Sequence, residues 1–372
     1  MRLTRLALTH FRNYERLDLE LGPGVFLLLG SNAQGKTNLL EAIHYLATGT
    51  SSRADTAREL ISWMPEEGDI PLAARLQAQL SGGEAESVDL TMIQEGPGAP
   101  VRKVVRVNGA TRPWRELPGH IRAVLFMPQD VELVAGPPAG RRRYLDAALS
   151  QLNGTYAREM AVYSRALRQR NHLLKRLRDR STDDRQLDVW DDRLAEPGAT
   201  LVALRWEAAQ AWDMLARPHH LLLTEETDDL RLRYSSVLAA VSGDWDNPPP
   251  EAEPDGLRRA LAERRREDIR RGSTSVGPHR DDLRFLVGSP SQRSDLIDLT
   301  VYGSRGQQRT AAVALKLAEA EHLRAVRGTE PVLLLDDVMS ELDPQRRRFL
   351  LDAVEGREQV IVTATELSPF PN

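Results

Sequence analysis

The 372-residue sequence contains no cysteine. This excludes disulfide bonds and every metal site that needs a thiolate ligand, and it fits a protein of a reducing compartment. No apolar run approaches the roughly 18 residues that a membrane-spanning helix requires, and the first residues lack the apolar segment of a secretion signal. From these absences we expect a soluble, cytoplasmic protein.

Lysine is also scarce. The chain has only four, at positions 36, 103, 175 and 316, beside 46 arginines, and its 54 acidic residues give a net charge of −4. That net charge argues against binding to nucleic acid through overall charge alone. Arginine suits phosphate recognition, but a compositional bias of the genome would produce the same preference and is the simpler interpretation. A lysine at position 36 nevertheless indicates a site where only a compact ammonium group fits.

A phosphate-binding loop is the clearest motif that is present. Residues 25–29 are an apolar run typical of a buried strand, residues 30–37 (GSNAQGKT) match the pattern G-x-x-x-x-G-K-[ST], and apolar residues at helical spacing follow. Backbone N–H groups of residues 33–37 would surround a β-phosphate, Lys36 would reach the β- and γ-phosphates, and Thr37 would ligate Mg²⁺. We therefore predict a site for a nucleoside triphosphate with Mg²⁺, formed by Gly30, Ser31, Asn32, Ala33, Gln34, Gly35, Lys36, Thr37 and Asn38.

An acidic motif near the other end of the chain supplies the second half of this site. Residues 332–335 are apolar and typical of a buried parallel strand, and Asp336 and Asp337 follow directly. Asp336 stands where a carboxylate would hold the Mg²⁺ shell, and Asp337 stands where a base could polarise the attacking water. The alternative is a strand that simply meets a polar loop. Together with a phosphate loop, the functional interpretation is favoured.

A glycine-rich stretch, residues 303–307 (GSRGQ), opens a long amphipathic helix. A helix start with unpaired N–H groups and a hydroxyl can hold an anion. The order phosphate loop, GSRGQ, LLLDD, SELD resembles the ABC-type ATPase head. The resemblance implies that the stretch caps the γ-phosphate bound by a second subunit, so that ATP joins two heads and hydrolysis releases them. It assigns the signature loop to Ser304, Arg305, Gly306 and Gln307, and the D-loop to the segment from Ser340 to Asp343. The alternative is a polar helix start without a ligand.

Three features depart from the pattern of that family. Asp337 replaces the usual glutamate, which places the base one methylene further back, so we expect at most a weak ATPase. Arg305 stands where many members have a second glycine, and residues 359–367 lack the switch histidine. Gln129 is a candidate for completing the Mg²⁺ shell, and a plain loop amide is an equally good interpretation of it.

A long helical stretch separates the two halves of the site. Apolar residues recur at steps of three and four over 156–177, where Arg170 interrupts them, and again over 187–215. This spacing is typical of two antiparallel helices with heptad-like packing, and Pro197 could kink the second. The stretch is too short for the long arms of chromosome-organising ATPases.

The predicted fold is therefore α/β: an ABC-type P-loop ATPase head with a helical lobe inserted between its two halves. Residues 1–112 are expected to form the N-terminal half of the head, which includes a hairpin with an Asn108-Gly109 turn. Residues 113–272 are expected to form the mainly helical lobe with its antiparallel coiled-coil-like hairpin. Residues 273–372 are expected to form the C-terminal half, with signature, acidic strand and D-loop.

Six segments spread over nearly the whole chain give a closer resemblance: HFRNYERLDLEL, GSNAQGKTNLLEAIHYLATG, GPPAGRRRYLDAAL, TSVGPHRDDL, YGSRGQQRTAAVALKLAE and LLLDDVMSELD. Together and in this order they resemble the RecF family of bacterial recombination mediators, with a head similar to those of SMC and Rad50 proteins. The resemblance implies an ATP-binding protein of DNA repair, DNA replication and the SOS response. It further implies recognition of gapped or junction DNA, an ATP-dependent homodimer, and cooperation with RecO and RecR in loading RecA.

The sequence says less about where DNA would bind. Arginines are dense in residues 141–143, 165–180 and 258–271, and such groups bind phosphates without sequence specificity. The alternative for each segment is a solvated helix face with ion pairs, which acidic neighbours support. A patch completed only when two heads close would let ATP control DNA binding. The candidate contacts are Arg141, Arg142, Arg143, Arg168, Lys175 and Arg176.

The segment GPHRDDL contains His279, Arg280, Asp281 and Asp282, and its residues have no evident mechanism. A hinge or a sensor of the nucleotide state is possible, and a structural turn is the favoured interpretation. Two other classes of protein share parts of the pattern. An SMC-like chromosome-structural ATPase is disfavoured by the short lobe, and a transporter ATPase subunit is disfavoured by the long insertion and the missing histidine.

Overall fold

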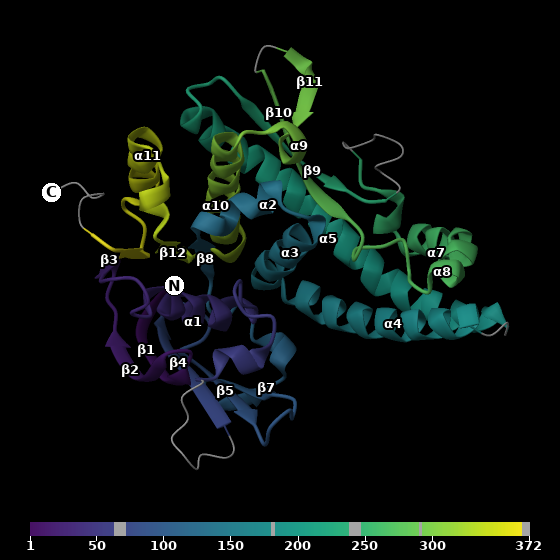
Figure 1. Cartoon of the computed structure of the whole chain (residues 1–372), viewed down its shortest axis with the longest axis horizontal. Coiled ribbons are helices and arrows are strands. Elements are labelled where there is room, and N and C mark those ends of the chain that lie inside the picture. Colours follow the sequence, from purple (N-terminus) through teal and green to yellow (C-terminus); the bar gives the residue numbers. More distant parts are fainter. Residues whose placement is uncertain (63–71, 180–182, 238–246, 290–291, 367–372) are drawn as a thin grey trace. The chain divides into compact units, whose positions relative to one another are not determined.

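The computed structural model describes residues 1–62, 72–179, 183–237, 247–289 and 292–366. The chain forms two compact units (Figure 1). Unit 1 comprises Met1–Asp130 and Val313–Asn372, and unit 2 comprises Val131–Ala312. In the described part of the chain, no helix combines the length and the apolar character that crossing a membrane requires.

Six antiparallel strands of unit 1 form its first sheet. Val107, the last residue of one strand, pairs with Ala110 of the next across the Asn108-Gly109 turn, and both turn residues have positive φ, 50° and 78°. Positive φ at both residues is typical of a type I′ turn, and the hairpin with the Asn108-Gly109 turn is present as predicted. The strands are, in sheet order, β2 (Tyr14–Glu20), β1 (Arg2–Phe11), β4 (Leu72–Ser81), β5 (Ser87–Gln94), β6 (Arg102–Val107) and β7 (Ala110–Arg112).

A second sheet of unit 1 has four parallel strands in the order β3 (Gly24–Leu29), β13 (Gln359–Ala364), β12 (Val332–Asp336) and β8 (Ala123–Phe126). Strands β12 and β13 are buried at every residue, as expected of central parallel strands. Helix α1 (Lys36–Thr48) packs against β8, β12 and β13. The fully buried Gln359 joins the two sheets, because its side chain both donates to and accepts from the backbone of Leu3 at 2.8 Å.

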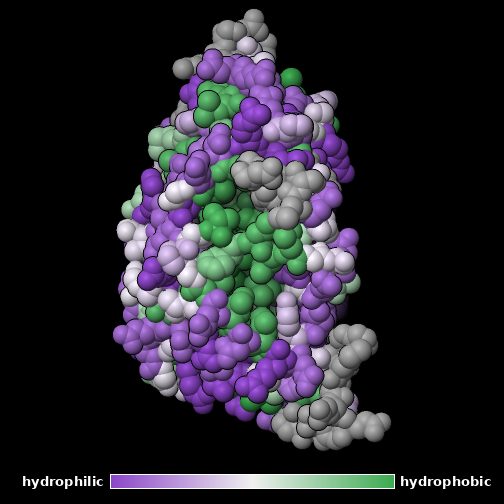
Figure 2. Space-filling model, turned by 90° about the vertical axis from the view of Figure 1, so that its left-hand side faces the viewer, coloured by the Kyte–Doolittle hydropathy of each residue, from purple (hydrophilic) through white to green (hydrophobic). Residues whose placement is uncertain are grey.

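Strand β3 lies at the edge of this sheet. Its side chains Val25 and Leu29 are 61% and 47% exposed, and because their positions have the same parity they give one face of the edge strand an apolar surface. Figure 2 views the molecule from the side on which β3 lies in Figure 1, and it shows a group of apolar residues at that surface. The remaining elements of unit 1 are short: η1 (Ala57–Leu60), η2 (Trp114–Glu116), η3 (Pro128–Asp130), η6 (Val338–Glu341) and α11 (Pro344–Val354).

Unit 2 is mainly helical. Helices α4 (Gly154–Asp179) and α5 (Asp188–Leu223) pack together extensively, as their apolar spacing predicts. Helix α5 continues through Pro197, and the next residue, Gly198, allows close packing, since a Cβ there would lie 2.4 Å from Leu257 and 3.0 Å from Tyr163. The other helices are α2 (Val131–Ala135), α3 (Pro138–Leu152), η4 (Asp184–Leu187), η5 (Pro250–Ala252), α7 (Pro254–Glu263), α8 (Arg265–Arg271) and α9 (Leu299–Tyr302).

A three-stranded antiparallel sheet completes unit 2, in the order β11 (Gln292–Asp298), β10 (Asp282–Ser289), β9 (Asp229–Ser235). This sheet explains why the units differ from the boundaries expected at 112/113 and 272/273. Strand β10 pairs with β9 of the lobe, so the chain directly after the expected boundary at residue 272 still belongs to unit 2. Strand β8 pairs with β12, so residues 123–126, which lie after the expected boundary at residue 112, still belong to unit 1. Helix α10 (Arg305–Arg327) begins in unit 2 and ends in unit 1.

Candidate nucleotide-binding site

The loop between β3 and α1 has the backbone geometry of an anion site. Gly35 has φ 100°, and a Cβ at this position would lie 2.8 Å from the Asn13 amide, so the turn requires glycine. No side chain caps the start of α1, which leaves its first N–H groups to a ligand. Lys36 donates from Nζ to the carbonyls of Gly30 and, at 2.9 Å, Ser31, so its ammonium lies inside the loop.

The two carboxylates of the second motif lie beside this loop. Asp336, 7% exposed at the end of β12, accepts hydrogen bonds from the hydroxyls of Thr37 at 2.9 Å and Thr363 at 2.8 Å. Asp337 follows in the left-handed conformation, φ 49°, and its N–H donates to the same Thr363 hydroxyl at 3.0 Å. Thr363 therefore holds both acidic residues in place against Thr37 of the phosphate loop.

Around these groups is a pocket of about 320 Å³ within unit 1. It is lined by Asn13, Asn32, Ala33, Gln34, Gly35, Lys36, Thr37, Asn38, Arg53, Asp336, Asp337, Thr363 and Thr365. Of the nine loop residues expected at the site, seven line this pocket, and Gly30 and Ser31 contribute the carbonyls that Lys36 contacts. The structure thus brings the phosphate loop and the acidic motif together, although the Thr37–Asp336 hydrogen bond joins positions 299 residues apart.

Sequence reasoning missed four of the lining residues: Asn13, Arg53, Thr363 and Thr365. Asn13 accepts a hydrogen bond from the Asn38 amide at 2.7 Å, and Arg53 donates to the other atom of that amide at 2.9 Å. Arg12, next to Asn13, has positive φ. Its guanidinium donates two hydrogen bonds, at 2.8 and 2.6 Å, to the buried carboxylate of Glu41 in α1. The only sequence signal for Asn13 was its place in the FRNYE segment.

The expected ligands of Mg²⁺ are only partly together. Thr37 and Asp336 present adjacent oxygen atoms, which are the ligands that Mg²⁺ prefers, and Mg²⁺ usually takes the rest of its shell from phosphates and water. Gln129, by contrast, is exposed in η3 and is not among the residues that line the pocket. The residues of this pocket therefore fit the metal through Thr37 and Asp336.

The signature stretch is structured by its own side chains. Ser304 accepts from the N–H of Gln307 at 3.2 Å, and the Gln307 amide oxygen accepts from the N–H of Ser304 at 3.0 Å. This reciprocal pair is a capping box at the start of α10. Arg305 forms an ion pair with Glu132 at 3.0 Å, and the Gln307 amide donates to Asp228 at 3.0 Å. The polar helix start is thus present, and Ser304 remains exposed.

The D-loop residues also have local roles. Ser340 donates to the carbonyl of Asp337 at 2.8 Å, which supports the left-handed turn there. Asp343 caps α11, because its carboxylate accepts from the backbone N–H of Arg346 at 2.9 Å. That hydrogen bond lowers the pKa of the Asp343 carboxyl. Both residues are exposed.

The candidate DNA contacts separate into two groups. Arg141 is only 3% exposed, forms two bonds to Asp282 at 2.6 and 2.8 Å, and donates to the carbonyl of Gly136 at 2.7 Å. The expectation that Arg141 contacts DNA is therefore wrong, since its charge is buried and already paired. Arg142 is half-buried, whereas the remaining candidates are exposed: Arg143, Arg168, Lys175 and Arg176.

The GPHRDDL segment is a structural turn with buried polar groups. Tyr163 bonds to Nδ1 of His279 at 2.7 Å, and Nε2 of His279 lies 3.0 Å from the carbonyl of Thr274. Burial lowers the pKa of His279 to about 4. Asp281, 1% exposed, accepts a hydrogen bond from the Tyr234 hydroxyl, and burial raises the pKa of its carboxyl to about 7. These contacts favour the structural interpretation of the segment.

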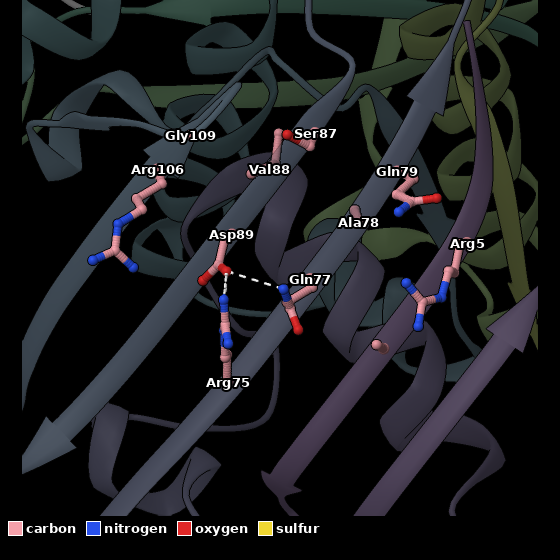
Figure 3. Close-up of a pocket in the computed structure, with 11 residues that line it drawn as sticks. Arg5, Arg75, Gln77, Ala78, Gln79, Ser87, Val88, Asp89, Arg106 and Gly109 are labelled. Atoms are coloured by element: carbon pink, nitrogen blue, oxygen red, sulfur yellow. Dashed lines mark hydrogen bonds and ion pairs between the residues drawn. The ribbon is translucent and has the colours of Figure 1, made fainter.

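A polar hollow of about 230 Å³ on the six-stranded sheet has a different character (Figure 3). Its arginines are largely neutralised by neighbours on the sheet. Arg75 and Gln77 both bond to Asp89, and Arg5 bonds to Asp18 at 2.7 Å. Because these ion pairs cancel most of the positive charge, we assign no ligand to this hollow.

Comparison with known proteins places this arrangement in one family. The family model described as the RecF/RecN/SMC N terminal domain matches residues 2–370. A protein of Symbiobacterium thermophilum named DNA replication and repair protein RecF is 43% identical over 368 residues, which cover 99% of this chain and 92% of the relative. The protein of the same name from Herpetosiphon aurantiacus is 42% identical, with 100% and 95% covered.

Solved structures agree. The recombination mediator protein RecF with ATP superposes with a TM-score of 0.85 at 32% identity, and the match covers 99% of this chain and 93% of that one. An Smc head domain from Pyrococcus furiosus shares the fold, with a TM-score of 0.51 at 14% identity over 98% and 89% of the two chains. The expected α/β ABC-type head with a helical insertion is confirmed, and the chain belongs to the RecF family.

Proposed function

We propose that this chain binds ATP with Mg²⁺, hydrolyses it slowly, and uses the bound nucleotide to control a DNA-binding homodimer in recombinational repair and replication restart. The observation that carries the proposal is the hydrogen bond between Thr37 and Asp336, which joins the phosphate loop to the acidic strand in one polar pocket. The RecF relatives, one of them solved with ATP, support it.

The central residues of the pocket have definite tasks in this proposal. The N–H groups at the start of α1 and the Lys36 ammonium would bind the phosphates, and Lys36 would exchange its two carbonyl contacts for phosphate oxygens. Thr37 and Asp336 would hold Mg²⁺, which supplies charge neutralisation on the β- and γ-phosphates. Asp337 would orient the attacking water. Its carboxylate is one methylene shorter than a glutamate, so hydrolysis is expected to be slow.

The signature stretch would act across a dimer. In the capping box the Ser304 hydroxyl uses its oxygen as an acceptor, and its proton stays available to donate to a phosphate. Ser304 can therefore keep α10 capped while it binds the γ-phosphate held by a second copy. Arg305, Gly306 and Gln307 would shape this loop, and Ser340 and Asp343 would lie at the same interface.

DNA binding is assigned to the exposed cations of unit 2: Arg143, Arg168, Lys175 and Arg176. Contacts from such groups to phosphates are strongly dependent on salt and independent of sequence. We propose gapped or junction DNA as the target, with RecR and RecO as partners and the loading of RecA as the outcome. The family membership supports these assignments, and closure of the dimer would gather cations from two copies.

The first test is the sedimentation mass of an Asp337→Asn protein with and without Mg-ATP. We expect a monomer without nucleotide and a dimer with it, because loss of the base preserves the nucleotide. The matched control is the same protein carrying Ser304→Arg, which should bind ATP and remain a monomer. A monomer under every condition would contradict the ATP-dependent dimer but not the ATP site. A dimer in both variants would contradict the role of Ser304.

A further inference from the structure

A second cavity, of about 520 Å³, lies within unit 2. Its lining residues recur at steps of three and four along α3 (139, 142, 143, 146) and along α4 (160, 163, 164, 167), so one face of each helix forms a wall. Arg205 and His279 complete it. Cavities of roughly 300–1,000 Å³ are the size of small-ligand sites. This cavity also joins the two segments, GPPAGRRRYLDAAL and GPHRDDL, that the nucleotide pocket leaves unexplained.

The floor of this cavity is fixed by internal hydrogen bonds. Arg205 is 1% exposed and donates to the Tyr156 hydroxyl at 2.7 Å, to Asp146 at 2.6 Å and to the Pro278 carbonyl at 2.5 Å. Tyr156 also donates to Asp146 at 2.5 Å. Arg205 therefore pairs with the Asp146 carboxylate through Oδ1, and the donors of Arg205 are taken up by the cavity floor.

Both ring nitrogens of His279 are also occupied by internal hydrogen bonds. The carbonyl of Thr274 beside Nε2 requires a proton on that nitrogen, so Nδ1 accepts from the Tyr163 hydroxyl. With its pKa lowered to about 4 by burial, His279 is neutral at physiological pH. Gly277 lets the turn approach, since a Cβ there would lie 2.6 Å from the Tyr163 hydroxyl. The aromatic ring of Tyr163 is thereby locked in the wall of the cavity.

Charge recognition falls to Arg142 at the rim. Arg142 is half-buried and donates one hydrogen bond, at 2.9 Å, to the carbonyl of Asp281, whereas a guanidinium has five N–H donors. Burial lowers the pKa of Arg142, a sign that its cation lacks solvent. Arg143 beside it is exposed. The opposite wall, on α4, presents Met160 and Leu167. The cavity thus combines the Arg142 cation with an apolar wall.

Helix α4 also carries a basic stripe on a face next to the one that lines the cavity. The helix carries seven basic residues and only two acidic ones, Glu159 and Asp179. Four of the basic residues, Arg165, Arg168, Lys175 and Arg176, are exposed and recur at near-helical spacing over about 16 Å of the helix axis. A stripe of this kind, with no matching row of carboxylates on the same helix, suits a run of phosphates rather than internal ion pairs.

We infer that the cavity takes one unpaired nucleotide, its phosphate on Arg142 and its base against Met160 and Leu167. The nucleotide belongs to a DNA strand whose neighbouring phosphates follow α4, so the inference rests on the proposed DNA-binding function. A duplex keeps its bases stacked inside and offers only phosphates, which the stripe alone can bind. Single-strand sites elsewhere combine the same two elements, a cationic track and apolar or aromatic surfaces for bases.

The test fills the cavity without changing its charge. In Ser164→Phe a bulky ring would occupy the space between α3 and α4. We expect the affinity for a fluorescein-labelled dT15 strand, measured by anisotropy, to fall about tenfold, the value of one lost base contact, while the affinity for a 15-base-pair duplex changes less than twofold. The matched control is Val162→Phe, on the same helix, 52% exposed and outside the cavity, which should bind both DNAs as the unaltered chain does.

Charge variants separate the cavity from the stripe. Arg142→Gln should weaken the strand more than the duplex, whereas Arg165→Gln should weaken both equally, as loss of a plain phosphate contact does. A free nucleotide could also occupy the cavity, so thymidine monophosphate is tested as a competitor of dT15. Competition at equal affinity per site would mean that the cavity serves free nucleotides. Competition only at far higher concentration would mean that the strand is the ligand. If an acidic peptide instead bound the cavity and Ser164→Phe left all DNA binding unchanged, the inference would be wrong.

A measurement on the unaltered chain guards against misfolded variants. A dT15 strand with one 5-iodouracil, irradiated in complex with the full chain, should crosslink to the tryptic peptide 159–165, which carries Met160 and Tyr163. Crosslinks confined to other peptides would overturn the inference while DNA binding stands. If the unaltered chain, with Mg-ATP, bound neither strand nor duplex, the proposed function itself would fail, and this failure differs from one confined to the Ser164 and Arg142 variants.

Discussion

Two sets of charged side chains, one in each unit, are used in opposite ways. In unit 1, Lys36 and Asp337 are partly exposed at a polar pocket, held by carbonyls, hydroxyls and backbone turns. In unit 2, Arg141, Arg170 and Arg205 are each at most 3% exposed and are paired with aspartates. Lys36 and Asp337 are solvated enough to meet a ligand, whereas the three buried arginines serve the fold through their aspartate partners. Burial and partners, more than residue type, therefore separate function from structure in this chain.

Removing Arg170 tests the structural half of this contrast and carries the largest expected effect. Its guanidinium bonds to Asp191 and Asp268, both at 2.7 Å, and all three side chains are buried. Arg170→Met would leave two buried carboxylates without this partner, so we expect the free energy of unfolding to fall by about 3–5 kcal/mol. Urea denaturation measures it, with the exposed Arg176→Met as control, expected within about 0.5 kcal/mol. A loss under 1 kcal/mol would contradict the contrast.

Changing Asp337 should give the reverse pattern, a loss of function without a loss of stability. Asp337→Asn keeps the side-chain shape and tolerates the left-handed backbone at φ 49°. We expect the rate of ATP hydrolysis to fall about 100-fold, the usual value of a general base, with an unchanged thermal midpoint. Steady-state phosphate release and a melting curve measure the two quantities. Unchanged hydrolysis would assign the base to another residue.

Replacing Lys36 also tests the functional side of the comparison, in which a partly exposed charge binds a ligand. Lys36→Met removes the ammonium from the loop and keeps the length of the side chain. Because charge-assisted hydrogen bonds contribute about 1.5–3 kcal/mol, we expect ATP to bind roughly 10- to 150-fold more weakly. Isothermal titration with Mg-ATP measures this, and Lys175→Met, which is not among the residues that line the pocket, is the matched lysine control. Equal affinity in both variants would mean that the loop does not hold the phosphates.

The smallest expected effect concerns Asp281, whose pKa burial raises from 3.8 to about 7. A raised carboxyl pKa means that the folded state holds a proton that the unfolded state has lost, so this group's contribution to stability is present at low pH and disappears as pH rises through 7. Between pH 6 and 8 the loss is about 1.4 kcal/mol. The unaltered chain should therefore lose about that much relative to Asp281→Asn over this range.

Urea denaturation of both proteins at pH 6, 7 and 8 measures the difference. The difference in stability between the two proteins, and not the pH profile of either one, reports on Asp281. Burial lowers the pKa values of His44 and His279 to about 3 and about 4, so these two histidines contribute stability that rises with pH. Those contributions are the same in both proteins and cancel. Parallel pH profiles would show that Asp281 does not titrate in the folded chain over this range.

The sequence predicts the nucleotide pocket well because its motifs are local. A glycine turn, a lysine and a helix start are read from eight consecutive residues, and an apolar strand followed by Asp336 and Asp337 is read from six. The sequence does not predict the pocket residues that the fold brings in from distant segments. Thr363 has no motif, yet strand β13 lies between β3 and β12 and places its hydroxyl between the two halves of the site.

Unit 2 was harder to predict for a physical reason. Arg170 interrupts an otherwise apolar helix face, and the sequence shows the interruption without the partner, because Asp268 lies 98 residues further on. Arg141 stands in a run of three arginines that the sequence cannot distinguish, although the fold buries the first, half-buries the second and exposes the third. Pairing across a fold is a long-range property, and spacing within a motif does not encode it.

The order of strands in the parallel sheet has a consequence for how the chain is made. Strand β3 leaves the ribosome early, yet its sheet neighbour β13 comes from residues 359–364, and the Thr37–Asp336 bond closes over 299 residues. At about 5–20 residues per second, the phosphate loop would wait about 15–60 s for the acidic strand. During that time β3 has no partner strand, and its apolar side chains, Val25 and Leu29 among them, would be open to chaperones or to other nascent chains.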